Sequence, residues 1–245
     1  MQDGLTSSVV ISQPMLFPWP GFFEALMLAD VYVDLDDVQF SKGSFTNRIQ
    51  LKFPEGRRWM TVPLDGKGSF QTIADLRAAD GDWRAQHRRM VQDSLHGAPY
   101  LADALAILDE AYHHEQLCDL LIASIDAPAA YLGIAAGARA RSHDLGIGGH
   151  SWGRVLDMVR HFGGNRYVTG HGAARYLDHQ AFEDAGVAVE YADYSCTPWP
   201  QGQGDFTPYV SILDLIARTG PEAASYLKPA TLPWRTFLER AGAPT

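Results

Sequence analysis

The N-terminal part of the chain alternates between apolar and polar stretches in a pattern that predicts a parallel βαβ unit. SVVISQP, residues 8–14, is typical of a short buried strand, and the proline- and aromatic-rich MLFPWPG after it predicts a loop. FFEALMLAD repeats its apolar residues at helical spacing, and VYVDLDDVQF begins with the β-branched and aromatic run of a second strand. This order of elements places the two strands parallel in one sheet.

A β-hairpin is predicted at residues 46–64, because NRIQLKF and RRWMTVPL alternate apolar and polar residues around a PEG turn. Residues 80–132 contain three stretches with helical spacing of their apolar positions: WRAQHRRMVQDSL, YLADALAILDEAYHH and QLCDLLIASIDAPAAYLG. The middle of the chain is therefore expected to be helical.

The C-terminal part continues with alternating helices and strands. SWGRVLDMVRHFGG predicts a helix with Ser151 as N-cap and Gly163 as C-cap, and RYVTG predicts the strand after it. QAFEDAG, SILDLIARTG and PEAASYL predict helices and VAVEYADY a strand, whereas the tail, residues 228–245, is expected to pack loosely. We expect one domain over residues 1–245 with an α/β fold: an open, mainly parallel sheet of βαβ units, an inserted β-hairpin and a helical middle segment.

Composition narrows the class of protein. Hydrophobic residues make up 46% of the 245, enough for a substantial core, and the net charge is −9 with basic residues scattered along the chain. This balance argues against a nucleic-acid binder. No apolar run approaches the ~20 residues of a membrane span, and the N-terminus lacks the pattern of a signal peptide, so a cytoplasmic location is expected. Cys118 and Cys196 fit a reducing compartment, and no disulfide is expected.

Familiar catalytic motifs are weak or missing. Residues 149–153, GHSWG, match the nucleophile-elbow pattern of serine hydrolases, but no buried strand precedes them, so helix capping by Ser151 is the better interpretation. Nine histidines occur without HExxH, CxxC or any other metal-ligand spacing, and we expect no metal site. Glycine-rich phosphate-binding loops are also missing.

A dense polar stretch, DLDDVQFSKGSFTNR, follows the second predicted strand, where open α/β sheets place their ligand crevice. Strand alternation would put Asp34 and Asp36 on one face of the sheet and Asp37 with Gln39 on the other. Turn-forming residues with a surface salt bridge explain the stretch equally well. The candidate ligand-binding residues in it are Asp36, Asp37, Gln39, Asn47 and Arg48.

Five further candidates lie outside this stretch. After another strand, YADYSCTPWPQGQGDFTPYVSILDL predicts an ordered, irregular loop in which Trp199, Gln201 and Tyr209 are candidate ligand contacts, although Trp199 is as well explained by core packing. His87, on a predicted helix, is a candidate general base or a solvated surface histidine. Cys196 is a remote candidate nucleophile, since no adjacent His or Lys would lower the pKa of its thiol.

The opening QPMLFPWPG, the LDDVQ and NR block and the ending PQ with FTPYVSILDL, in this order, resemble the WbqC-like family from about Val9 to Gly220. The resemblance implies formation of an amide: an acyl- or aminoacyltransferase acting on an amino sugar or related amine, in O-antigen, other polysaccharide or specialised natural product biosynthesis. The sequence departs from the family pattern at Ser12, where many relatives carry histidine, and at His171.

From this resemblance we expect a thioester donor, on an acyl carrier protein or coenzyme A, and no tightly bound cofactor. Asp37 or His87 would take the proton from the amine. Ser12, Gln13, Asp36, Gln39, Asn47 and Arg48 would bind the substrates or steady the oxyanion, with Gln201 and Tyr209 on the opposite wall. Two alternatives remain: an ATP-dependent amide ligase with a nucleotidylyltransferase-like fold, and a non-catalytic binding partner of a sugar-modifying pathway.

Overall fold

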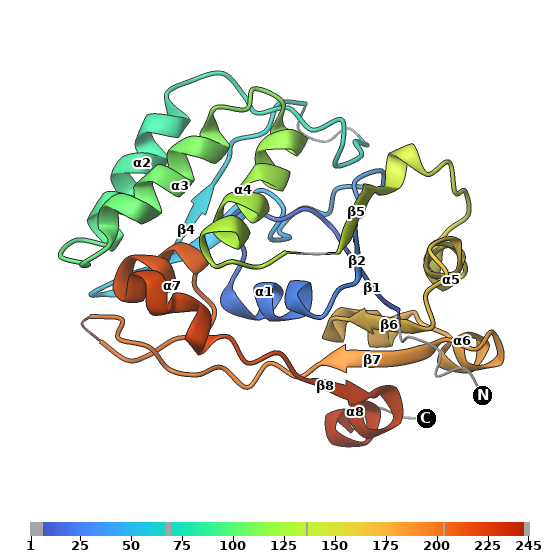
Figure 1. Ribbon diagram of the computed structural model, residues 1–245. Coiled ribbons are helices and arrows are strands. Elements are labelled where there is room, and N and C mark those ends of the chain that lie inside the picture. The colour runs from blue at the N-terminus through green and yellow to red at the C-terminus, as the bar shows by residue number, and fades with distance from the viewer. Residues whose placement is uncertain (1–6, 67–69, 136, 203, 243–245) are drawn as a thin grey trace.

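The computed structural model in Figure 1 describes residues 7–66, 70–135, 137–202 and 204–242. Its centre is a six-stranded sheet with the strand order β5-β2-β1-β6-β7-β8, in which only β8 runs antiparallel to its neighbour. The predicted α/β class with a mainly parallel sheet is confirmed. The strands are β1 (Ser8–Ser12), β2 (Val31–Asp34), β5 (Ala138–Arg141), β6 (Arg166–Thr169), β7 (Ala188–Ala192) and β8 (Thr231–Pro233).

The connections reverse direction next to β1. From β1 the chain passes through α1 (Pro20–Met27) to β2, and β5 later adds on the far side of β2. The chain then returns to pair β6 with the opposite side of β1 and continues outward to β7. Open α/β sheets bind ligands at such a reversal, outside the carboxyl ends of the strands. A ligand site is therefore expected among the loops that follow β1, β2, β5 and β6.

Alternating side chains of β1 belong to cores on opposite faces of the sheet. Val10 packs into a cluster with α1 and the helical middle segment, whereas Val9 and Ile11 pack into a second cluster with α5 (Ser151–His161) and α6 (His179–Asp184). Because both of its faces are covered, β1 reads as a continuous apolar run, as strands of other parallel sheets do.

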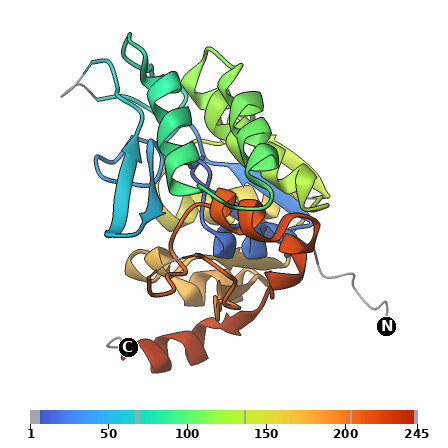
Figure 2. The same cartoon turned by 90° about the vertical axis from the view of Figure 1, so that its left-hand side faces the viewer.

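The predicted helical segment and hairpin are both present. The helices are α2 (Trp83–Ser94), α3 (Leu101–Tyr112) and α4 (Leu117–Tyr131), and α7 (Ile212–Thr219) packs against α3. The hairpin, β3 (Arg48–Phe53) and β4 (Gly56–Thr61), forms a separate two-stranded sheet beside α2, at the outer edge of the molecule in Figure 2. Short 3-10 helices η1 (Ser142–Asp144) and η2 (His171–Arg175) follow β5 and β6 directly.

Three local predictions are wrong. Ser151 does not cap α5: it is the first helical residue, with φ 57°, and His150 occupies the N-cap position without a side-chain hydrogen bond. PEAASYL forms a 3-10 helix, η3 (Gly220–Tyr226). Residues 231–241 of the tail are held in place, because β8 pairs with β7 and α8 (Trp234–Ala241) stacks Phe237 on Tyr191 with ring centroids 3.9 Å apart.

Candidate functional site

Three parallel strands end at one level and bring polar residues together. In the strand register, Ser12 of β1 pairs with Asp34 of β2, and Asp34 pairs with Arg141 of β5. Neighbouring strands are ~4.8 Å apart, so these ends form one continuous edge. The residues just beyond it belong to the turn after β2 and to η1 after β5.

Asp36 is the centre of the hydrogen-bond network at this edge. Its side chain is fully buried, and its Oδ2 accepts hydrogen bonds from Arg141 Nε at 2.8 Å and from His143 Nδ1 at 2.6 Å. Its Oδ1 accepts from the His143 backbone N–H at 3.2 Å and lies 3.1 Å from Ser142 Oγ. Burial raises the pKa of Asp36, but the hydrogen bonds from Arg141 and His143 outweigh it and hold the pKa below its usual value. Asp36 is therefore a fixed, ionised carboxylate.

His143 connects the buried Asp36 carboxylate to the protein surface. The side chain of His143 is 39% exposed, while the carboxylate bound to its Nδ1 is entirely buried. Its Nε2 lies 3.0 Å from Oδ1 of Asp144, whose side chain is 66% exposed. A buried carboxylate that holds one ring nitrogen fixes the orientation of the imidazole and directs the other nitrogen outward.

Asp37 joins the same network. Its Oδ1 accepts a hydrogen bond from Ser142 Oγ at 2.6 Å, and its Oδ2 pairs with Arg154 Nη2 of α5 at 2.5 Å. Burial raises the pKa of Asp37, yet the bonds from Arg154 and Ser142 prevail and lower it overall. With both oxygens engaged and a depressed pKa, Asp37 is a weak proton acceptor.

The expected separation of these aspartates onto two faces is wrong. Strand β2 ends at Asp34, and the chain turns at once, with the Asp36 N–H donating to the Asp34 carbonyl. Alternation therefore does not extend to Asp36 and Asp37, and Ser142 contacts both. The alternative of a surface salt bridge does not describe Asp36, because its side chain has no exposed area.

Two further residues complete the edge. Asp34, also buried, is bound by Arg139 Nε and Nη2 at 2.7 and 3.0 Å. Cys118 of α4 lies with its Sγ 3.2 Å from Arg141 Nη2, and burial raises the pKa of its thiol to about 12 despite that cation. The Cys118 thiol is thus a packed neutral group of the network.

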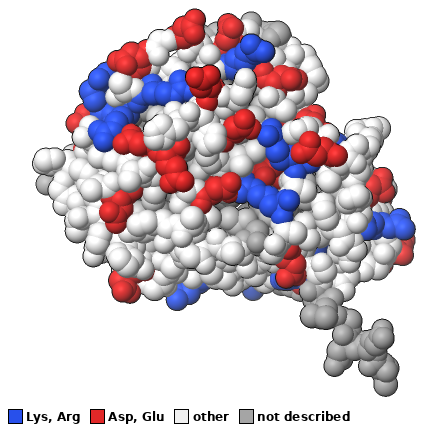
Figure 3. Space-filling view, turned by 45° about the horizontal axis from the view of Figure 1, so that its top comes forward, with Lys and Arg blue, Asp and Glu red and all other residues white. Residues whose placement is uncertain are grey.

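A pocket adjoins the network. Arg141 donates to Asp119 of α4 at 2.9 Å, and both residues line a pocket of about 480 Å³. Apolar residues of α4, including Ile122 and Ala123, form its floor, and Glu110 and Asp126 add two more carboxylates. On the face shown in Figure 3, Lys and Arg side chains lie next to Asp and Glu side chains.

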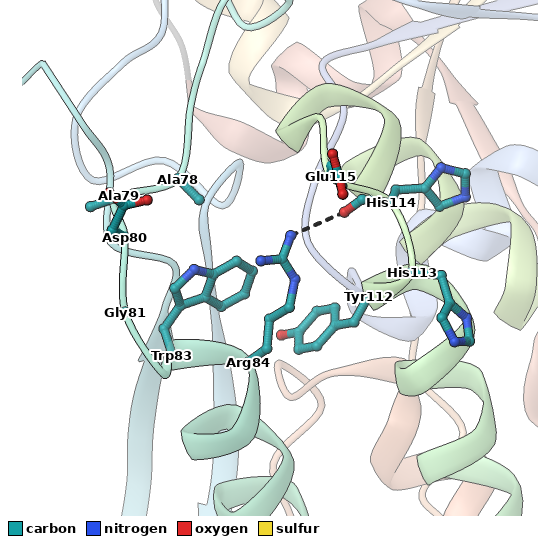
Figure 4. Close-up of a pocket in the computed structure, with 10 residues that line it drawn as sticks. All are labelled: Ala78, Ala79, Asp80, Gly81, Trp83, Arg84, Tyr112, His113, His114 and Glu115. Atoms are coloured by element: carbon teal, nitrogen blue, oxygen red, sulfur yellow. Dashed lines mark hydrogen bonds between the residues drawn. The ribbon is translucent and has the colours of Figure 1, made fainter.

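A second pocket of about 530 Å³ lies away from the sheet edge, between residues 78–81 and 113–115 (Figure 4). The Arg84 guanidinium projects into it above the Trp83 ring, 4.4 Å from its centroid, and donates to the His114 carbonyl. No candidate residue from the sequence lines this pocket.

His87 lies in the core between α2, α3 and the hairpin. Its Nδ1 is 2.7 Å from the Tyr112 hydroxyl and its Nε2 is 3.1 Å from the Thr61 carbonyl. Burial lowers the pKa of His87 to about 4, so the ring is neutral at pH 7. No hydrogen bond joins it to Asp36 or Asp37, the other candidates for proton transfer, within the described residues.

The other candidates from the polar stretch have local partners. Asn47 is buried and donates to the Val62 carbonyl at 2.9 Å. Arg48 donates to the Gly43 carbonyl and covers the Trp59 ring at 4.1 Å. Gln39 is exposed and forms an isolated bridge with Thr72. These residues shape the loop between β2 and the hairpin.

Gln201 and Trp199 hold the loop after β7. The Gln201 side chain bonds to both backbone groups of Thr207 and accepts from Lys52 Nζ at 3.2 Å. Trp199 is buried and donates to Asp214 Oδ1 at 2.8 Å, which agrees with core packing. Tyr209, in contrast, is 55% exposed.

Cys196 lies in the same loop. Its backbone φ is 22°, and burial raises the pKa of its thiol. A raised pKa disfavours the thiolate that a nucleophile requires.

Ser12 and Gln13 are partly exposed at the carboxyl end of β1. The loop after them continues into a row of aromatic rings, in which Trp19 and Phe45 have centroids 5.2 Å apart and Phe45 and Trp59 5.6 Å apart. Tyr194, from the loop after β7, closes on the same loop, since a Cβ added to Gly21 would lie 2.7 Å from its ring. The later part of the loop after β1 is thereby lined by aromatic side chains.

The sequence interpretation missed Arg141, Ser142 and His143. They follow a short strand, ARAR, whose polar and only partly buried residues give little strand signal. The signal that identifies them is the SHD triplet directly after a strand, since strand ends carry the site in this class of fold.

Metal-binding clusters and membrane-spanning helices are both absent from the described ranges. No group of three or more His, Cys, Asp or Glu side chains there is arranged to hold a metal ion. No helix in the same ranges has the length and apolar character needed to cross a bilayer.

Comparison with known proteins places the chain in a family. The profile of the WbqC-like protein family matches residues 13–226. The chain belongs to this family. It is 31% identical over 225 residues to the uncharacterized protein Rv1507c of Mycobacterium tuberculosis, an alignment that covers 90% of this chain and 97% of the relative. No solved structure matches the chain significantly.

The matched WbqC-like region contains the whole polar network. It begins at Gln13, directly after β1, and ends at Tyr226 in η3. Asp36, His143 and Arg154 lie within it, whereas β8 and α8 lie beyond its C-terminal limit. The family region thus includes every loop at the carboxyl edge described above.

Proposed function

We propose that this WbqC-like protein is an acyl- or aminoacyltransferase that forms an amide on an amino sugar or related amine from a thioester. The observation that carries the proposal is the pair of buried Asp36 and exposed His143, joined at 2.6 Å at the carboxyl edge of the sheet. An imidazole oriented by a buried carboxylate is a common device for accepting a proton during acyl transfer.

The proton step uses His143 rather than the candidates expected from sequence. An acceptor amine arrives as an ammonium ion and must lose a proton before it attacks. The exposed Asp144 carboxylate, 3.0 Å from His143 Nε2, is placed to bind that ammonium ion, and Nε2 then accepts its proton. Asp36 stabilises the imidazolium formed, while Asp37 and Arg154 hold Ser142 and the turn in position.

The acceptor occupies the pocket beside the network. Its acidic lining, including Glu110 and Asp119, favours a cationic amine, and its apolar floor suits the carbon face of a sugar. A ligand there lies next to Arg141, the direct neighbour of Asp36.

The donor thioester approaches from the end of β1. The free amine attacks the thioester carbonyl, and a carbon–nitrogen bond forms. The carbon–sulfur bond then breaks, the thiolate leaves and takes the proton held by the imidazolium, and the nitrogen loses its second proton to solvent. Ser12 and Gln13 are the partly exposed polar side chains at this strand end, and the Gln13 amide is suited to donate to the developing oxyanion. Such a reaction belongs in the cytoplasmic synthesis of O-antigen, another polysaccharide or a specialised natural product.

The test is product formation by the purified protein. We expect an acetyl thioester of N-acetylcysteamine and a panel of UDP-linked amino sugars to give an amide detectable by mass spectrometry. His143→Gln should lower kcat/KM by at least about 100-fold, as for loss of a general base, whereas His161→Gln on the exposed side of α5 should leave it within twofold. Amide formation that needs ATP and releases AMP or ADP would instead identify a ligase. Thermal stabilisation by the amino sugar without turnover would identify a binding protein.

A further inference from the structure

Positive charge is concentrated in one segment of this acidic chain. Residues 42–58, the hairpin and the loop before it, contain five basic residues and one acidic residue, although the net charge of the chain is −9. Most other arginines are neutralised locally, as Arg139, Arg141 and Arg154 are at the sheet edge. Residues 42–58 therefore carry a net positive charge in a chain whose net charge is negative.

Three of the five basic residues of the segment lie on one face of the hairpin. Arg48, Lys52, Arg57 and Trp59 share the same face by strand alternation, because Gln50 pairs with Trp59 and Lys52 with Arg57. Opposite them, Ile49, Leu51 and Met60 are buried. This first face, the outer face of the hairpin, is exposed at Arg57 and Trp59 but covered at Lys52, which is buried and donates to the Asp205 carbonyl at 2.8 Å.

The cations of the outer face are not neutralised. Lys42, Arg48, Lys52 and Arg57 form no ion pair with any carboxylate in the part of the chain that the structure describes. Lys42, in the loop before the hairpin, and Arg57 are exposed, and Trp59, whose ring centroid lies 4.1 Å from the Arg48 guanidinium, is 40% exposed. Exposed tryptophan among arginines is the composition of protein-interface hot spots.

The outer face is connected to the donor side of the proposed site. Trp59 contacts Phe45, and Phe45 contacts Trp19 in the loop that follows Ser12 and Gln13. A partner seated on the hairpin can therefore extend a flexible arm along these rings to the loop that follows β1.

We propose that the outer face of the hairpin, Lys42, Arg48, Arg57 and Trp59, docks an acidic carrier protein that presents the acyl group as a thioester. This inference rests on the proposed acyl transfer and names the donor of that reaction. Charge complementarity selects the partner. The unpaired cations attract an acidic surface to this face, and the negative charge of the rest of the chain repels such a surface elsewhere. The aromatic row then receives the arm.

The experiment measures docking separately from turnover. Binding of an acetylated bacterial acyl carrier protein, labelled with a fluorophore, is followed by anisotropy at 50 and 300 mM salt. Wild-type protein should bind, with weaker affinity at high salt. The Lys42→Glu/Arg57→Glu variant should bind about 100-fold more weakly, at about tenfold per reversed charge. Arg160→Glu, an exposed cation on α5, is the matched control and should change Kd less than twofold.

Turnover then separates the two proposals. The double variant should lose kcat/KM with the carrier-protein donor but retain it within twofold with the N-acetylcysteamine thioester. Equal binding by wild-type and double variant, no binding by wild-type, or equally tight binding of single-stranded DNA would overturn the docking assignment. Carrier binding that depends on the hairpin, with no turnover of either thioester, would refute the acyl transfer while leaving the docking surface in place.

Discussion

Replacement of Asp36 by asparagine tests the network at the sheet edge. Asp36→Asn keeps the shape of the side chain but removes the charge that faces Arg141 Nε at 2.8 Å and His143 Nδ1 at 2.6 Å. Breaking a buried ion pair by removing one partner costs about 3–5 kcal/mol. Because Arg141 and His143 are 30% and 39% exposed, water compensates part of that loss. We expect a loss of about 3 kcal/mol in the free energy of unfolding at pH 7.

The difference between Asp36→Asn and wild type should depend on pH in one direction. The pKa of Asp36 is lower in the folded protein than the ~3.9 of an unfolded chain, so its contribution is complete above about pH 5. It is lost as the pH falls below 4 toward the folded pKa. Urea unfolding at pH 7 should show the midpoint lowered by about 1 M, and the difference should narrow between pH 4 and 3.

Asp109→Asn is the matched control, because Asp109 also binds an arginine, Arg88, at 2.9 Å, with both side chains about 40% exposed. We expect a loss of less than about 1 kcal/mol for this surface pair. If Asp36→Asn costs no more than Asp109→Asn, or if its cost is the same at pH 3 and pH 7, the buried carboxylate does not hold the network together.

Three further changes test other parts of the structure. Gly137→Ala should lower the free energy of unfolding in urea by about 2–3 kcal/mol, because the added Cβ would lie 2.5 Å from the Asp30 carbonyl oxygen. Gly148→Ala is the control: its Cβ would meet no atom within 4 Å, so it should be nearly neutral. Equal effects of the two substitutions would contradict the close packing at Gly137. The pKa of His87 is about 4 in the folded protein and about 6.5 in an unfolded chain, so protonation of the unfolded chain destabilises the protein as the pH falls from about 6.5 to 4. His87→Leu should remove about 3 kcal/mol of this pH dependence of the free energy of unfolding. An unchanged pH dependence would show that His87 is not buried as a neutral ring. The pKa of buried Asp214 is raised to about 6 from the ~3.9 of an unfolded chain, so its contribution to stability is lost as the pH rises from about 4 to 6. Asp214→Asn should therefore raise stability at pH 8 by about 1–2 kcal/mol but not at pH 4, as followed by thermal unfolding, and a loss at pH 8 would contradict this sign.

Local patterns were sufficient for much of the fold. The βαβ unit and the hairpin follow from apolar periodicity, the Pro20 helix start and the turn between β3 and β4, all of which act within a few residues. The tail was misjudged because its order comes from distant partners: β8 pairs with β7, and Phe237 stacks on Tyr191. No periodicity within the tail reveals those contacts.

The site was predictable only in part, for the same physical reason. The aspartates after β2 were identified because the end of a strand is a general location for ligands. Their partner His143 is 107 residues further along the chain, and the two meet only through the pairing of β2 with β5. His87, in contrast, looked accessible on a polar helix but is buried against the hairpin and Tyr112.

The most direct test of the central claim compares these two histidines in one assay. Initial rates of amide formation from the N-acetylcysteamine thioester and amino sugar give kcat/KM for wild type, His143→Gln and His87→Gln, with folding of each variant verified by circular dichroism. Proton transfer by the Asp36–His143 pair predicts a loss of at least about 100-fold for His143→Gln and a change of less than threefold for His87→Gln. Full activity of folded His143→Gln would contradict the assignment of the catalytic base to the sheet edge.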